Sequence, residues 1–316
     1  MRFVAASEEF VLGGKIGDGA VGLVRKATRV FDSLPVAVKF LAPDPKYIQE
    51  EIFGDVAARF RREGLRGAEL QHQNLLEILA YEDNADGVKF SKKAGAPTNP
   101  FIVMEYVQGK TLESYVRTLP GEDGKSFSVT KEKLQIAVAA AEAIQFLHKM
   151  RIVHRDVKPA NIFLSNEFMG SPRVKLGDFG ITKWNDFHSS ISSGTLTMTH
   201  QRGLGTLKYM APEQAVSPKD VTAKADVFSF GITLFELFTG QILAGPHNVY
   251  ETLLHRMSRG TTVSRFNQMG INFSIADDAL GALILDMHSR GPSGRPSMEK
   301  VKGTLTFMLS QKSDES

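Results

Sequence analysis

The sequence predicts an α+β fold with two lobes, a small β-rich lobe with one main helix and a larger, mainly helical lobe after it. Its 316 residues, at roughly 150 residues per domain, suggest about two domains or lobes. Short β-branched runs separated by glycines fill residues 10–40, which is typical of a strand meander. After Thr111 long helical stretches appear instead, the clearest at 131–150 and 226–239.

The remaining elements follow in order along the chain. Residues 47–70 are rich in Glu, Arg, Ala and Leu and predict one or two helical pieces. Two apolar runs, 75–80 and 101–106, predict strands, and the Gly-, Asn-, Lys- and Pro-rich segment 83–100 between them predicts an exposed hairpin loop. We therefore expect a first lobe over 10–107, a second over 108–308, and a disordered polar tail over 309–316.

Composition excludes several classes of protein. The net charge of +3 is too small to indicate a nucleic-acid or membrane partner, and the lack of cysteine excludes disulfides, thiolate zinc sites and a cysteine nucleophile. Glu8 and Glu9 interrupt the start of the chain before a signal peptide could form. The most apolar window, 227–246, contains Glu236 and three glycines, which favours a buried helix over a membrane span. We expect a cytoplasmic protein.

A glycine-rich segment between two predicted strands is the first candidate for chemistry. Its glycines would let backbone amides approach a polyphosphate, although an ordinary glycine-rich hairpin is an open alternative. A dinucleotide-binding fold would need a helix directly afterwards, whereas the sequence here predicts strand, turn and strand. The segment is Gly17-Asp18-Gly19-Ala20-Val21-Gly22.

Lys39 is the second candidate, because it lies in the predicted strand 36–40. Strand alternation directs Ala37 and Lys39 to one face of the sheet. A lysine facing a core would need an anionic partner, whereas a lysine on an edge strand would lie in solvent. By itself the residue does not decide between these two alternatives.

Three downstream motifs decide the matter. They resemble, in order and nearly letter for letter, the signature set of protein kinases. The chain is accordingly identified as a member of the protein serine/threonine kinase family over about residues 10–308, and stretches 60–63 and 102–107 are most similar to bacterial receptor-type kinases. The motifs are His154-Arg155-Asp156-Val157-Lys158-Pro159-Ala160-Asn161, Lys175-Leu176-Gly177-Asp178-Phe179-Gly180 and Met210-Ala211-Pro212-Glu213.

The resemblance implies a bilobal protein-kinase-like fold, with ATP and Mg²⁺, or Mn²⁺ in its place, as cofactors. Asp156 would accept the proton of the substrate hydroxyl, and Lys158 would contact the transferred phosphoryl group. Asn161 and Asp178 would hold the metal ions, and Lys39 would bind the α- and β-phosphates.

The resemblance also requires a helix glutamate that pairs with Lys39. Four glutamates precede the next predicted strand, and the family pattern favours Glu63, although all four could be solvated surface charges. The candidates are Glu50, Glu51, Glu63 and Glu69. One turn further on, Gly67 replaces a larger apolar residue, which we expect to loosen this helix because a mid-helix glycine costs about 1 kcal/mol relative to alanine.

The predicted strand 101–107 resembles the strand and hinge that hold adenine in the family. This resemblance makes Met104 the gatekeeper and the backbone of Glu105 and Val107 the adenine contacts. Three further residues would enclose the ring, although apolar residues at strand spacing are more often plain core. These are Val24, Ala37 and Phe163.

Two structural roles follow from the same resemblance. Asp226 would hold the backbone of the catalytic loop, and Phe228 replaces the usual tryptophan beside it. Glu213 and Arg295 would form an ion pair within the large lobe.

Lys158 and Thr206 follow the serine/threonine pattern, so the expected substrates are serine and threonine hydroxyls of proteins. Two rival functions are a pseudokinase scaffold, which the presence of every required ionisable group opposes, and a small-molecule kinase, which residues 205–206 and 211–213 oppose. The chain carries no membrane segment, so it is either a soluble kinase or the catalytic fragment of a receptor.

Arg155, directly before Asp156, marks family members whose activation loop is ordered by phosphorylation. Lys183 and Arg59 would complete an anion pocket. We therefore expect one copy of this kinase to phosphorylate another in the loop between Asp178 and Glu213, at threonines ahead of serines. The alternative is that these residues are only the ordinary composition of a flexible loop. The threonines are Thr195, Thr197 and Thr199.

Overall fold

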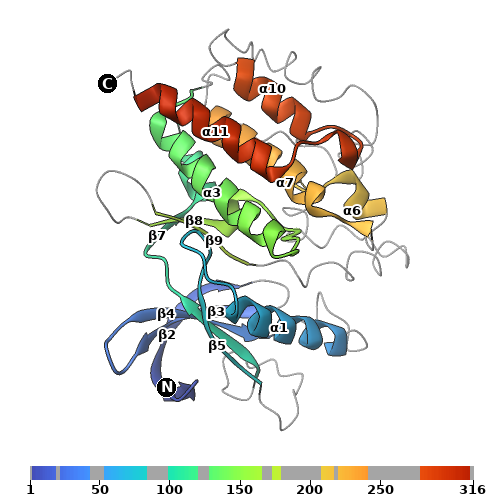
Figure 1. The fold of residues 1–316 in the computed structure, drawn as a ribbon. Coiled ribbons are helices and arrows are strands. Elements are labelled where there is room, and N and C mark those ends of the chain that lie inside the picture. Colours follow the sequence, from blue (N-terminus) through green and yellow to red (C-terminus); the bar gives the residue numbers. More distant parts are fainter. Residues whose placement is uncertain are drawn as a thin grey trace.

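The computed structural model has the two lobes that the sequence predicts, a small sheet with one helix and a large helical lobe (Figure 1). The chain passes from the small lobe to the large one between β6, which ends at Glu105, and β7, which begins at Gly109. The structure describes residues 2–18, 22–42, 53–83, 99–119, 128–165, 173–178, 208–216, 220–240 and 278–313.

The small lobe contains a six-stranded antiparallel sheet in the order β1-β2-β3-β4-β6-β5. Alternation along β4 places Val36, Val38 and Phe40 in an apolar core on one face, and Ala37 and Lys39 on the other. The second face is the one that bears the candidate site. The strands are Arg2–Ala5, Glu8–Asp18, Gly22–Arg29, Pro35–Leu41, Ile78–Glu82 (β5) and Phe101–Glu105 (β6).

Strand β1 was not expected, because the predicted lobe begins only at Phe10. Phe3 of this strand stacks on Phe10 and contacts the edge of Phe101. The turn that joins β1 to β2 uses Ala6 and Ser7 with φ angles of 47° and 65°. Such a turn is normally signalled by Asn or Gly, so the sequence lacks the pattern that would have revealed the hairpin.

Helix α1, Phe53–Ala68, packs unusually closely against β5. A Cβ atom on Gly64 would lie 2.4 Å from Cδ2 of Tyr81, and one on Gly67 would lie 2.2 Å from Cδ1 of Ile78. The expectation that Gly67 loosens this helix is therefore incomplete, because Ile78 fills the space that a larger residue would need. The first part of the predicted helical segment, 47–52, lies outside the described residues.

The large lobe is built around α7, Ala223–Thr239, which is buried along its whole length from Ala225 onward. Helix α7 starts after the N-cap Thr222 and ends at Gly240, where φ is 69°. Within the described parts of the chain, no helix is both long and apolar enough to cross a membrane. The other helices are α2 Leu112–Arg117, α3 Lys131–Lys149, α6 Pro212–Val216, α10 Asp278–Met287 and α11 Met298–Ser313, with short 3₁₀ turns at Pro159–Asn161 and Pro292–Gly294.

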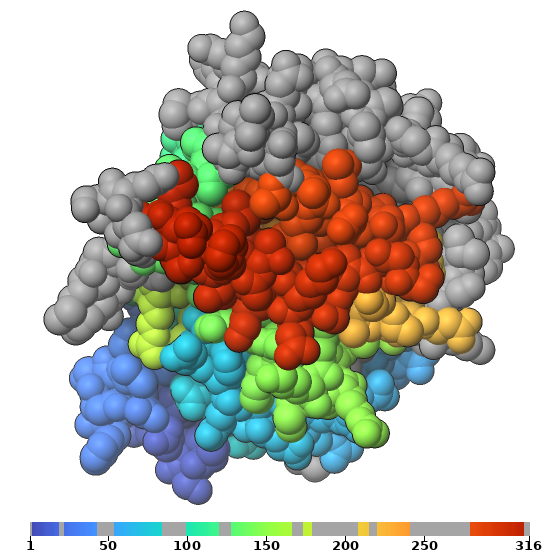
Figure 2. Space-filling model, turned by 45° about the horizontal axis from the view of Figure 1, so that its top comes forward, coloured from blue at the N-terminus to red at the C-terminus, as the bar shows by residue number. Residues whose placement is uncertain are grey.

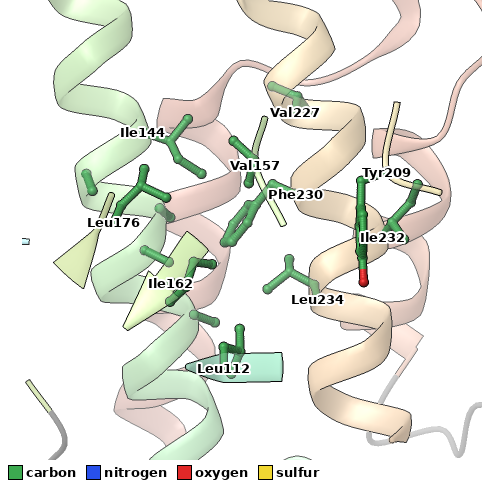
Figure 3. Packing of buried hydrophobic residues seen from close by; sticks show 14 of the residues in the cluster. Leu112, Ile144, Val157, Ile162, Leu176, Tyr209, Val227, Phe230, Ile232 and Leu234 are labelled. Carbon is green, nitrogen blue, oxygen red and sulfur yellow. The ribbon is translucent and has the colours of Figure 1, made fainter. Parts of the chain in front are cut away.

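A three-stranded sheet in the order β7-β8-β9 lies where the two lobes meet (Figure 1). In the core, Phe230 of α7 points toward Val157 and Ile162 (Figure 3). These two residues directly follow Asp156 and Asn161, the candidates in the catalytic loop. The apolar core thus fixes the segment that bears Asp156 directly against the central helix. The strands are Gly109–Thr111, Ile162–Ser165 and Val174–Leu176.

Helices α10 and α11 form a continuous band across the large lobe in Figure 2. Helix α11 continues to Ser313, so the prediction of a disordered tail from residue 309 is wrong for residues 309–313. The sequence has no Gly or Pro there to end the helix, and polar residues alone do not stop one. Residues 314–316 lie outside the described part.

We expect Gly64→Ala to lower stability, because the new Cβ would strike the ring and Cβ of Tyr81, which cannot move independently of the backbone. Overpacking of this kind costs about 1–3 kcal/mol and outweighs the gain in helix propensity. Gly303→Ala in α11 is the matched control, since nothing lies within 4 Å of its new Cβ. Urea unfolding should show a loss for the first variant and a gain of up to about 1 kcal/mol for the second. Equal gains would contradict the close packing of α1 on β5.

Candidate active site

Lys39 lies at the centre of the candidate site. Its Nζ is 2.7 Å from Oε1 of Glu63 on α1 and 3.0 Å from Oδ1 of Asp178. Burial by itself would lower the pKa of Lys39, but the carboxylates of Asp178 and Glu63 outweigh it and hold the pKa above its ordinary value. The lysine is thus charged at neutral pH and joins the sheet, the helix and the segment after β9. The predicted pairing of Lys39 with Glu63 is present.

Asp156 forms a second cluster with two residues that follow it. Nδ2 of Asn161 donates to both the backbone oxygen and Oδ2 of Asp156, at 2.8 and 2.9 Å. Nζ of Lys158 lies 3.1 Å from the same Oδ2. The 3₁₀ turn at Pro159–Asn161 returns the chain so that residues 156 and 161 meet. The carboxylate is therefore held in a fixed orientation beside a cation.

Asp226 anchors this loop from the start of α7. Its fully buried carboxylate accepts hydrogen bonds from the backbone amides of His154 and Arg155, at 2.8 and 2.7 Å, and lies 2.8 Å from Nε2 of His148. Arg155 has a φ of 64°, a conformation that costs a residue with a side chain free energy unless its surroundings fix it. The predicted role of Asp226 in holding the loop backbone agrees with these contacts.

Gly177 connects the loop to Asp178. Its amide donates to the backbone oxygen of Asn161 at 2.9 Å, and its carbonyl lies 3.2 Å from Nε2 of His154. Nδ1 of His154 accepts from the amide of Asp156, so Nε2 carries the proton of a neutral ring. Burial lowers the pKa of His154, which agrees with this neutral form. His154 is a positioning residue that the motif alone did not reveal.

Strand register brings the predicted adenine contacts onto one face of the small-lobe sheet. Val24 lies opposite Lys39, and Ala37 lies opposite Met104. Residues directly opposite each other in an antiparallel pair share a face, so these four side chains lie on the side of Lys39. Phe163 comes from β8 in the large lobe, on the far side of the junction.

The end of β6 supplies the predicted hinge. The amide of Glu105 donates to the carbonyl of Glu77 at 2.9 Å. Because this amide is already engaged, the carbonyl of Glu105 is the backbone group that could accept from an adenine amino group. Val107 lies two residues later, in the connection between the lobes.

The glycine-rich segment joins two paired strands, as predicted. Gly17 lies opposite Val24 and Asp18 opposite Leu23, whereas Gly19, Ala20 and Val21 lie outside the described residues. A Cβ on Gly22 would lie 2.3 Å from the backbone oxygen of Phe40. The third glycine of the motif is thus required by the packing of β3 on β4, independently of any ligand.

The side-chain oxygens of Asn161 and Asp178 suit a hard divalent cation that a nucleotide would bind at the same time. Nδ2 of Asn161 donates to Asp156, so the side-chain oxygen of Asn161 is the atom that could bind a cation. Asp178 binds Lys39 through one oxygen of its carboxylate. No cluster of three or more His, Cys, Asp or Glu suited to a metal occurs among the described residues. Mg²⁺ typically takes one or two carboxylates and completes its ligands with phosphates and water.

Two further structural expectations can be compared with the contacts. Arg295 binds Glu213 through both terminal nitrogens of its guanidinium group, at 2.5 and 2.8 Å, which is the expected ion pair. The guanidinium also lies 4.8 Å from the ring centre of Phe228, the residue in place of the usual tryptophan. The pair fixes α6 to the segment between α10 and α11.

The regulatory candidates are covered only in part. Thr195, Thr197, Thr199, Thr206 and Lys183 lie outside the described residues. Burial lowers the pKa of Arg155, and the nearby carboxylate of Asp226 opposes that shift. Arg155 is partly buried, whereas Arg59, one turn before Glu63 on α1, is buried.

Comparison with known proteins agrees with this arrangement. The protein kinase domain family matches residues 10–306. A probable serine/threonine-protein kinase PknB of Bifidobacterium longum is 32% identical over 242 residues, and PknB of Mycobacterium leprae is 34% identical over 239. PrkC of Bacillus subtilis, also a serine/threonine-protein kinase, is 34% identical over 253 residues.

These alignments cover 76%, 74% and 80% of the chain but only 31%, 33% and 34% of the relatives. The chain thus corresponds to about a third of each of these relatives. The family match extends over nearly all of the chain, and the motifs of that family meet in space as described above. The chain belongs to the protein kinase family, among serine/threonine kinases of the bacterial type.

Proposed function

We propose that this chain transfers the γ-phosphoryl group of ATP to serine and threonine hydroxyls of proteins. One observation carries the proposal: Lys39 is bonded to both Glu63 and Asp178, while Asp156 and Asn161 are bonded to each other and tied to Asp178 through Gly177. Phosphoryl transfer asks a protein mainly for positioning and for neutralisation of charge, and this arrangement supplies both.

The nucleotide would lie between the lobes. Its adenine would rest between Val24 and Ala37 above and Phe163 below, with Met104 behind it and the backbone of Glu105 and Val107 along its edge. Lys39 would bind the α- and β-phosphates, and Glu63 would keep its ammonium group in place. Gly17–Gly22 would cover the phosphates.

Asn161 and Asp178 would hold Mg²⁺, for which Mn²⁺ could substitute because both prefer oxygen ligands. When bound, the cation would supply positive charge that offsets the negative charge of the phosphates. The protein's own contribution is to fix these two side chains: Asn161 through its bonds to Asp156, and Asp178 through Lys39.

Asp156 would act as the base. Its carboxylate would accept the proton of the substrate hydroxyl as that oxygen bonds to the γ-phosphorus and the bond to ADP breaks. Asn161 orients the carboxylate, and Lys158, 3.1 Å from Oδ2, would offset negative charge on the phosphoryl group in transit. No step requires a cysteine, which the chain lacks.

The substrates include, on this proposal, a second copy of the chain, phosphorylated in trans on Thr195, Thr197 or Thr199. A phosphate there would meet the positive charge of Arg155, and Arg59 and Lys183 would complete the anion pocket. Thr206 would belong to the platform that receives the acceptor peptide. A cytoplasmic location stays a prediction.

Asp156→Asn should lower turnover by about 10²- to 10⁴-fold while leaving nucleotide affinity nearly unchanged, because the side chain acts on the hydroxyl proton and not on ATP. Turnover should be measured with labelled ATP, Mg²⁺ and a degenerate peptide array, which also separates a protein kinase from a scaffold or a small-molecule kinase. Asp286→Asn, an exposed aspartate on α10, is the control and should keep wild-type turnover. Retention of more than about a tenth of wild-type turnover by Asp156→Asn would show that another group is the base.

Incubation with ATP should add phosphate to the threonines of the loop, and mass spectrometry should find it at residues 195, 197 or 199 ahead of the serines. Asp156→Asn should stay unmodified alone but become modified when mixed with wild-type protein, because the transfer is between molecules. A fully active wild-type protein with an unmodified loop would contradict regulation by autophosphorylation.

A further inference from the structure

Lys175 is a buried lysine to which neither the sequence motifs nor the proposed chemistry assigns a role. It lies in the middle of β9, three residues before Asp178, and its side chain is 7% exposed. Its Nζ is 2.7 Å from Oε2 of Glu105 and 3.2 Å from the backbone oxygen of Leu75. A buried ammonium group is costly unless it is paired and hydrogen-bonded, so these two contacts hold it in one position.

The two contacts belong to segments with different functions. Glu105 ends β6, in the small lobe, and its backbone is the proposed adenine contact. Leu75 lies in the loop 69–77, which follows helix α1 and therefore Glu63. Lys175 itself lies just before Asp178, at the phosphate end of the site. One side chain on β9, near the phosphate end, thus contacts both the adenine end and the loop that follows the helix of Glu63.

The loop 69–77 is fixed to β9 by several other bonds, so it moves with the large lobe. The amide of Leu76 donates to the carbonyl of Leu176, and the amide of Leu176 donates to the carbonyl of Asn74, both at 2.8 Å. Nδ2 of Asn74 donates to the carbonyl of Val174 at 3.1 Å. These bonds do not involve Lys175, and they would hold β9 and Asp178 in place without it.

The side chain of Glu105 has fewer bonds than those that hold the loop 69–77 to β9. Oε2 accepts from Lys175 and, at 3.4 Å, from the amide of Glu77. Among the contacts of the described residues, the ion pair with Lys175 is the direct side-chain link between the end of β6 and β9, and it adds to an indirect link in which the amide of Glu105 donates to the carbonyl of Glu77 in the loop 69–77. Without the ion pair, the carboxylate, which is 26% exposed, would turn toward water, and the end of β6 would be held to β9 only indirectly, through Glu77 and the loop 69–77.

We infer that Lys175 is a positioning residue that sets the spacing between the adenine contact at Glu105 and the phosphate contact at Asp178. A nucleotide that reaches both ends binds well only if this spacing matches its length. Loss of the ion pair should weaken the binding of nucleotides that span the site and should hardly affect the binding of ligands that occupy the adenine end alone. This inference rests on the proposed nucleotide site.

The test compares two ligands, ADP with Mg²⁺, which spans the site, and adenosine, which does not. Their dissociation constants should be measured by titration of the folded wild-type protein and of Lys175→Met and Glu105→Gln. Glu105→Gln keeps the shape of the side chain and serves if Lys175→Met fails to fold. We expect each variant to bind ADP with Mg²⁺ about five- to tenfold more weakly, as for partial loss of a charge-assisted bond, and adenosine within about twofold of wild type.

The double variant should bind no more weakly than the weaker single variant, because either change alone already breaks the pair. Lys133→Met is the matched control. Lys133 is also buried, but it contacts Ser128 and the carbonyl of Phe238 at the far end of the large lobe, so its loss should leave both dissociation constants unchanged.

Three results would overturn the inference. They are unchanged affinity of the variants for ADP with Mg²⁺, an equal loss of affinity for adenosine, or a loss of affinity in the double variant that equals the product of the two single losses. Failure of the wild-type protein itself to bind ADP with Mg²⁺ would instead refute the proposed nucleotide site. The two failures are therefore distinguishable.

Discussion

The carboxylate of Asp226 is the constraint on which the rest of the site depends. It is fully buried at the start of α7, and the amides of His154 and Arg155 both donate to it. These bonds hold Arg155 at a positive φ that the residue would otherwise avoid. The loop that presents Asp156 and Asn161 is therefore shaped by the core of the large lobe, and the packing of Phe230 against it makes the attachment rigid.

From this anchor a continuous series of polar contacts runs to the small lobe. His154 and Asn161 both bond to Gly177, which precedes Asp178. Asp178 pairs with Lys39 on the sheet, and Lys39 pairs with Glu63 on α1. Each member is a charged or polar group that is costly to bury alone, so the contacts support one another. The close packing of α1 on β5 at Gly64 and Gly67 adds a steric limit to the position of Glu63.

The motif residues could be predicted from the sequence because they lie in short, distinctive stretches whose chemistry demands particular residue types. Glu63 and Arg295 could be paired with their partners for the same reason. Strand β1 could not, because its turn uses Ala6 and Ser7 where the sequence signal would be Asn or Gly. The role of Gly67 depends on Ile78, and that of Lys175 on Glu105; each partner lies in a different element, so only tertiary structure reveals these contacts.

Asp226 assembles the catalytic loop, and the variant Asp226→Asn tests this role most directly. Asparagine offers one acceptor oxygen, and its NH₂ group would face one of the two backbone amides, which would then lose its acceptor. Turnover of labelled ATP and peptide should be measured on variant protein that circular dichroism shows to be folded. We predict a loss of at least about a hundredfold, the scale expected when a catalytic group is misplaced by about an ångström. Turnover near that of the wild type would contradict the account.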